Sequence, residues 1–167
     1  AAGAFAAAAA ADVVVMVGSP ASGKSSFARR LAAAGYKVAS QDAQGSKARC
    51  KAALAAWLSS GFRVVVDNTH RSAAARAEYV AAARAARAGL RVAIVWVATP
   101  PWVCQHLDGL RCDSDTGGGT RLLPRPVIPG YWKNFEAPAP GEADVLAPLD
   151  FAWEPRTPAD VRAKRYA

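Results

Sequence analysis

The chain has 167 residues, a length that suits one domain with its own core. Hydrophobic residues make up 52% of it, but 41 residues are alanine, and no apolar run approaches the ~20 residues of a membrane-spanning helix. The net charge is +8, and residues 1–100 carry 13 basic and only 4 acidic side chains. This basic part suits a polyanionic partner such as nucleic acid, although solvated helix faces encoded by a GC-rich genome would give the same excess. We therefore expect a globular domain without membrane contact.

Short β-branched runs alternate with Ala-rich stretches along the chain. They predict strands at 12–17, 36–40, 62–66 and 91–97 with a weak fifth at 143–146, and helices at 24–34, 46–59, 72–89, 101–110 and 127–135. Such alternation builds parallel β-α-β units, so we expect an α/β fold with about five parallel strands and helices on both faces. Residues 12–148 form the domain in this interpretation. Residues 1–11 are read as an Ala-rich tail or linker, and 149–167 as a C-terminal tail.

A phosphate-binding pattern lies between the first predicted strand and helix. Residues 18–25 read G-S-P-A-S-G-K-S, which matches G-x-x-x-x-G-K-S. Backbone N–H groups of such a loop surround a β-phosphate, the lysine reaches the β- and γ-phosphates, and the serine hydroxyl binds Mg²⁺. An ordinary Gly/Ser turn is the alternative. The residues predicted to bind nucleotide are Gly18, Ser19, Pro20, Ala21, Ser22, Gly23, Lys24, Ser25 and Ser26.

Two acidic residues follow predicted strands. Asp67 ends the third strand, where P-loop proteins place a carboxylate that holds Mg²⁺ or its water, and Asp42 follows the second strand, where it could accept a proton from an attacking hydroxyl. Each could instead be a turn residue. No N-K-x-D motif is present, which argues against a GTPase.

Several short motifs then follow in a defined order. They are Asp42 with a Gly45-Ser46 segment and an Arg49-Cys50 pair, Asp67-Asn68-Thr69 with Arg76 and Tyr79, His106 with Arg111, and an aromatic-basic stretch from Tyr131 to Pro138. In this order the sequence resembles the kinase domain of polynucleotide kinase/3′-phosphatase, a DNA-end repair enzyme of the P-loop kinase superfamily. The resemblance runs from about Val13 to Leu146.

The resemblance implies a three-layer, NMP-kinase-like fold with a lid near 101–125, and ATP-dependent phosphorylation of 5′-hydroxyl ends of DNA or RNA. It implies a general base at Asp42, charge stabilisation by Lys24 and Arg111, and Mg²⁺ held by Ser25 and Asp67. Asp42, Thr69 and Arg76 would lie toward the substrate. Nuclear location, a role in DNA break repair and a monomeric state are expected on the same ground. No D-x-D-G-T motif is present, so this chain is expected to carry the kinase half only.

The sequence departs from the family pattern at two positions. Gln41 stands where the family has an arginine before the catalytic Asp, and Gly109 stands at the first of two lid arginines. Arg121 or Arg125 could compensate. Two other functions therefore stay open: a P-loop kinase for a small molecule, and a nucleotide-dependent binding domain with weakened catalysis.

A few other residues could serve a site. His70 could contact substrate or have no role, His106 is expected to pack or act as a lid hinge, and Trp132 is the best surface candidate for stacking on a base. Trp57 and Trp96 are expected in the core. Three cysteines without metal-binding spacing argue against zinc and disulfides, and fit a reducing compartment.

Overall fold

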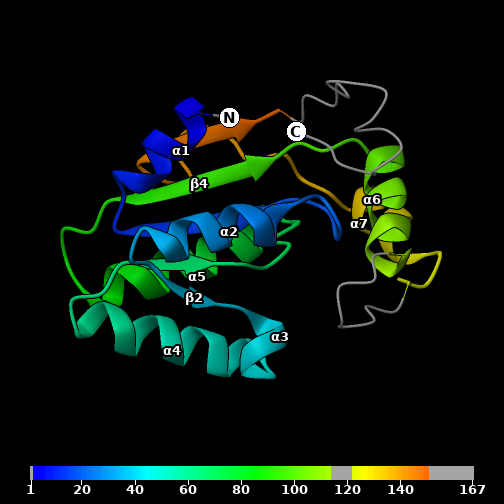
Figure 1. Cartoon of the computed structure of the whole chain (residues 1–167). Helices are drawn as coiled ribbons and strands as arrows, with labels where there is room; N and C mark the ends of the chain where they lie inside the picture. The colour runs from blue at the N-terminus through cyan, green and yellow to red at the C-terminus, as the bar shows by residue number, and fades with distance from the viewer. Residues whose placement is uncertain (1, 114–121, 151–167) are drawn as a thin grey trace.

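The computed structural model describes residues 2–113 and 122–150 (Figure 1). Its sheet has five parallel strands in the order β2-β3-β1-β4-β5. The strands are β1 (Val13–Val17), β2 (Lys37–Ala39), β3 (Val64–Val66), β4 (Val92–Val97) and β5 (Val145–Leu149). The helices are α1 (Ala2–Ala9), α2 (Lys24–Ala33), α3 (Gln41–Gln44), α4 (Lys47–Ser59), α5 (Ala73–Ala86), α6 (Pro101–Asp113) and α7 (Val127–Lys133). The predicted α/β class and parallel sheet are confirmed.

The central strand β1 is apolar along its whole length because both of its faces are covered. Val13, Val15 and Val17 lie in one core cluster with α4 and α5, and Val14 and Met16 lie in a second cluster with α1 and α2. All five side chains are fully buried. A continuous apolar run is what a central parallel strand requires. The sheet is thus the middle of three layers.

Helix α1 belongs to the domain, and the expectation of a tail or linker over 1–11 differs from the structure. Ala8 and Ala11 are buried in the second cluster, and the Tyr36 hydroxyl donates to both of their carbonyl oxygens. Phe5 packs edge-on against Phe27 of α2, with ring centroids 5.7 Å apart. Figure 1 shows α1 lying over β4 and β5. These contacts cover a part of the sheet that would otherwise be exposed to solvent.

Other element boundaries differ from those expected. Strand β5 extends through Pro148 to Leu149, which an edge strand permits because it needs hydrogen bonds on one side only. Helix α3 was not anticipated, since four residues are too few to show a helical period. Helix α6 runs on to Asp113. No helix of the described ranges has both the length and the apolarity that crossing a membrane requires.

Candidate nucleotide and acceptor site

The loop between β1 and α2 is shaped by close packing around Gly18. A Cβ on Gly18 would lie 2.8 Å from both the Ser22 Oγ and the Val97 carbonyl oxygen, so no other residue fits without a shift. The Gly18 N–H donates to the Thr69 carbonyl at 3.2 Å, which fixes the loop to the segment after β3. Gly23 adopts a left-handed conformation with φ 96° as it starts α2. The loop therefore has the tight backbone that a phosphate cradle needs.

The charged and hydroxyl groups of the loop lie at the start of α2. Lys24 is 7% exposed, and its Nζ donates to the Ser19 carbonyl at 2.7 Å, so the ammonium folds back over the loop. Ser25 and Ser26 are exposed on the first turn of α2. The loop is tied to the end of β4 by the Thr99 hydroxyl, which donates to the Ser22 carbonyl at 2.8 Å. This arrangement presents N–H groups and an ammonium to an anion at a helix N-terminus.

Asp67 lies beside the loop because β3 is the direct neighbour of β1. Val15 pairs with Val66, so the half-buried Asp67 follows at the level where β1 runs into the loop. No group of three or more His, Cys, Asp or Glu side chains in the described ranges could hold a metal alone. One hydroxyl and one carboxylate nevertheless fit Mg²⁺, which usually takes one or two protein ligands and completes its shell with phosphate oxygens and water. Ser25 and Asp67 are the residues that would hold it.

Asp42 lies in a helical turn rather than in a plain turn. Ser40 caps α3 by accepting from the Ala43 N–H at 3.1 Å, and Gly45 ends it in a left-handed conformation. The Asp42 side chain is exposed in the first turn. Strand β2, which leads into α3, does not pair with β1, because β3 lies between them. Asp42 is therefore connected to the phosphate loop through β3, and not through direct pairing of β2 with β1.

A cleft of about 740 Å³ opens between the phosphate loop, the start of α3 and α4, and α7. Among the residues that the structure describes, its lining holds two basic side chains, Lys47 and Arg71, and no acidic one. Lys47 also forms an exposed ion pair with Glu78 at 2.7 Å. The lining residues are Pro20, Gln41, Lys47, Asn68, Thr69, His70, Arg71, Ser72, Ala75, Tyr79, Pro126, Val127, Gly130, Tyr131 and Asn134. The cleft thus suits an uncharged or anionic group next to the phosphate loop.

His70 lines this cleft and is buried beneath its surface. It is 5% exposed, has a positive φ of 41°, and its Nδ1 lies 2.7 Å from the Met16 carbonyl oxygen. Burial lowers its pKa to about 4, so the ring is neutral at pH 7. A carbonyl can only accept, so Nδ1 carries the proton and the buried Nε2 is left as an acceptor, without a partner among the described residues.

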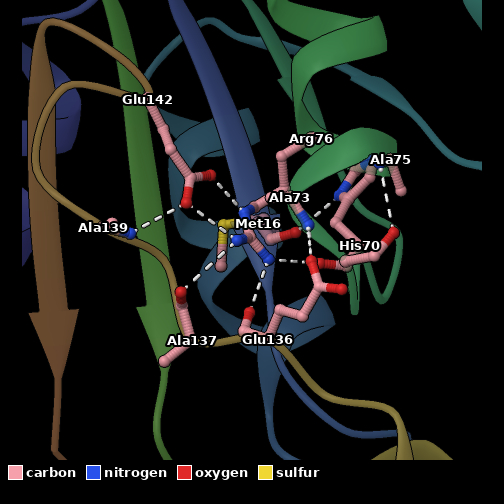
Figure 2. Close-up of polar contacts among 10 residues, drawn as sticks. Met16, His70, Ala73, Ala75, Arg76, Glu136, Ala137, Ala139 and Glu142 are labelled. Atoms are coloured by element: carbon pink, nitrogen blue, oxygen red, sulfur yellow. Dashed lines mark hydrogen bonds and ion pairs between the residues drawn. The ribbon is translucent and has the colours of Figure 1, made fainter.

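Arg76 has a different place from the substrate side that the resemblance implied. Its side chain is fully buried, and it forms two hydrogen bonds to the Glu142 carboxylate, one of them 2.8 Å long (Figure 2). It also donates to the carbonyls of Glu136 at 2.8 Å and His70 at 3.2 Å. The pKa of Glu142 is lowered by this pairing. Arg76 therefore holds α5, His70 and the segment 136–142 together, a role that its spacing in the sequence did not reveal.

The predicted lid residues are placed only in part. His106 is exposed on α6, Gly109 lies in the same helix, and Arg125 is exposed just before α7. The side chain of Arg111 and all of Arg121 lie outside the described residues. Figure 1 shows α6 and α7 together beyond the carboxyl ends of the strands, where a lid would be.

Trp132 is not the free surface ring that was expected. It packs edge-on against Phe135 and Tyr131, with centroids 5.1 Å and 5.5 Å away, and its Nε1 is buried. Trp96 packs on the same Phe135 at 5.8 Å and contacts the core, as does Trp57, which agrees with their expected core position. The aromatic stretch thus builds the wall behind the cleft.

The chain is similar to several known proteins. A family model described as an AAA domain, AAA_33, matches residues 13–116. A relative from Acanthamoeba polyphaga mimivirus, named "Putative bifunctional polynucleotide phosphatase/kinase", is 30% identical over an alignment of 134 residues that covers 75% of this chain and 32% of the relative. The chain therefore spans less than a third of the length of that relative.

Solved structures share the fold at low identity. A gluconokinase from Sinorhizobium meliloti 1021 superposes with a TM-score of 0.61 at 22% identity, over 85% of this chain and 83% of its own. Kti12 from Chaetomium thermophilum, solved in complex with ADP-AlF3, superposes with a TM-score of 0.64 at 19% identity, over 90% of this chain and 94% of its own. These likenesses establish the fold.

Proposed function

The chain belongs to the AAA_33 family and has the fold of P-loop kinases, and from this premise we propose that it is an ATP-dependent kinase for the 5′-hydroxyl ends of DNA or RNA. The observation that carries the proposal is the cleft beside the phosphate loop, with Asp42's helix at its edge and only basic charges in its lining. The name of the mimivirus relative supports a polynucleotide as the acceptor. A monomeric enzyme of DNA break repair, located in the nucleus, is part of the same proposal.

The residues of the phosphate loop and of the segments beside the cleft would divide the reaction between them. The loop N–H groups and Lys24 bind the phosphates of ATP and stabilise the charge that develops on the γ-phosphoryl group. Asp42 accepts the proton of the 5′-hydroxyl while the hydroxyl oxygen attacks the γ-phosphorus and ADP leaves. Ser25 and Asp67 would hold Mg²⁺, which would neutralise phosphate charge when bound. Arg111 from the lid adds positive charge, and Thr69 lies at the acceptor side of the loop.

The test is transfer of the γ-phosphate from ATP to a DNA oligonucleotide with a 5′-hydroxyl end. The same oligonucleotide with a 5′-phosphate serves as a control that has no acceptor. Asp42→Asn is expected to lower the transfer roughly 10²–10⁴-fold while ATP binding is unchanged, because loss of a general base costs that much. A wild-type chain that binds ATP but phosphorylates neither DNA nor RNA ends would overturn the proposal.

A small-molecule kinase is the second candidate, because a cleft of about 740 Å³ falls within the range of small-ligand pockets. Equal rates on a nucleoside and on an oligonucleotide would favour it. A binding domain with weakened catalysis is the third, because Gln41 and Gly109 lack the charge of the family's arginines. Recovery of transfer in Gln41→Arg with Gly109→Arg would identify that third case.

A further inference from the structure

Asn68 joins the phosphate-loop side of the sheet to the helix that carries Asp42. It is the second residue after the end of β3 and is half-buried in the cleft wall. Its Oδ1 accepts from the Gln41 N–H at 2.8 Å, while its Nδ2 donates to the Tyr79 hydroxyl at 3.3 Å and faces the Cys50 Sγ at 3.7 Å. The backbone N–H of Gln41 can only donate, so this amide orientation is required by its partners.

Helix α3 has little else to hold it in place. It has four residues and none of them is buried, so no apolar face anchors it to the core. The bond from Ser40 to Ala43 and the bond from the Gly45 N–H to the Gln41 carbonyl are internal to the turn. Across the described ranges, the Asn68–Gln41 bond is the hydrogen bond that joins α3 to the segment after β3. Apart from the chain links to β2 and α4, the Asn68 side chain is thus what holds the first turn of α3 against the segment after β3.

The neighbours of Asn68 extend this link to the phosphate loop. Asp67 donates its N–H to the Ala39 carbonyl at the end of β2, and the Thr69 carbonyl accepts from Gly18. Three successive residues therefore contact β2, α3 and the loop. A shift of α3 away from this segment would change the distance between Asp42 and a nucleotide in the loop.

We propose that Asn68 is a positioning residue, which holds Gln41 and so keeps the Asp42 carboxylate at a fixed distance from the phosphate loop. This inference rests on the proposed function for its kinetic part only. The effect is on geometry: a misplacement of about 1 Å can cost roughly 10²-fold in rate. Removing the Asn68 amide is therefore expected to lower the kcat for phosphorylation of the acceptor. The KM for ATP should change little, since the phosphate loop itself is not altered.

The experiment compares Asn68→Ala, Asn68→Asp and Cys50→Ala by amide hydrogen exchange and by kinetics. In Asn68→Ala, we expect faster exchange over 41–45 and a kcat about 10- to 100-fold lower, with the KM for ATP within about twofold. Asn68→Asp keeps an acceptor for the Gln41 N–H, so exchange over 41–45 should return toward the wild-type rate. Cys50→Ala removes a contact on the other side of the amide and should leave that exchange unchanged.

Each outcome has a defined meaning. If the exchange rate over 41–45 in Asn68→Ala equals the wild-type rate, the proposal is overturned. An equally large increase of that rate in Cys50→Ala also overturns it, because general packing would then hold the turn. Faster exchange with an unchanged kcat overturns the kinetic part. If the wild-type chain phosphorylates no polynucleotide end, the proposed function fails, while the exchange result still decides whether Asn68 positions α3.

Discussion

The phosphate loop and the acceptor side of the cleft are built in opposite ways. The loop is one continuous segment, 18–25, in which Lys24 bonds to Ser19, and its outside contacts come from residues at or just past the ends of the two strands that neighbour β1, namely Thr69, Val97 and Thr99. The acceptor side is assembled from segments near 41–47, 68–79 and 126–134, joined by side chains such as Asn68 and Arg76. Nucleotide binding should therefore depend on a few loop residues, whereas acceptor use depends on contacts distant in sequence.

The largest expected effect is on the loop side. Lys24→Ala should lower phosphate transfer to every acceptor on the order of 10³-fold, because a preorganised group that stabilises transition-state charge is lost. Steady-state transfer rates to an oligonucleotide and a nucleoside measure it. Lys37→Ala, at the exposed start of β2, is the matched control and should match wild type. If Lys24→Ala lowered transfer to only one of the two acceptors, the contrast between the phosphate loop and the acceptor side would be contradicted.

The next effect is on the scaffold of the acceptor side. Glu142→Ala should lower the free energy of unfolding by about 3 kcal/mol, because it leaves the Arg76 guanidinium buried without its counter-charge. This value is at the lower end of the usual cost of removing one partner of a buried ion pair, because Glu142 is partly exposed. Urea denaturation measures the change. Glu78→Ala, which breaks only exposed ion pairs, should change stability little, and equal losses in the two variants would contradict the role given to Arg76.

The stability of the acceptor side should also depend on pH through His70. Its pKa is about 4 when folded and 6.5 when free, so below pH 6.5 the unfolded chain binds a proton that the folded chain does not. Stability should therefore fall as the pH drops from 6.5 to 4, by about 3 kcal/mol in all. Thermal unfolding across this range measures it. His70→Asn, whose amide can still donate to Met16, should flatten that part of the curve; an unchanged slope would show that His70 is not its source.

The smallest effect is on the basic rim of the cleft. Lys47→Gln and Arg71→Gln should each weaken oligonucleotide binding a few-fold and reduce the slope of log K against log salt by about 1. Binding of ATP should not change. Fluorescence anisotropy at several salt concentrations measures both slopes. Lys51→Gln is the control, because Lys51 shares Glu78 with Lys47 but does not line the cleft; an identical salt slope in all three variants would remove the rim from the acceptor site.

The parts that could be predicted from the sequence are those whose signal is local. The run Val13–Val17, the spacing of Gly18, Gly23 and Lys24, and the helix after them lie within about one β-α unit, so the pattern alone predicts their geometry, and the fold is confirmed. The functional assignments of Lys24, Ser25, Asp42, Asp67 and Thr69 stay predictions.

The missed features depend on partners far along the chain. The buried Arg76 is paired with Glu142, 66 residues later, and also donates to the Glu136 carbonyl, so nothing near it in the sequence distinguishes it from an exposed arginine. Helix α1 consists almost wholly of alanine, so no periodic apolar face indicated that it packs on the sheet. The burial of His70 in the loop after β3 could not be predicted either, because it depends on Met16, 54 residues earlier in β1.

The strand order has a consequence for how the chain folds. Strand β1 is made first, but its two neighbours, β3 and β4, end only at Val66 and Val97. Most of the domain must therefore be synthesised before both edges of this strand of five consecutive apolar residues are paired. Such non-local pairing slows folding and leaves an aggregation-prone segment exposed on the nascent chain. The strand on which the phosphate loop depends is thus also the one whose edges stay unpaired longest while the protein is being made.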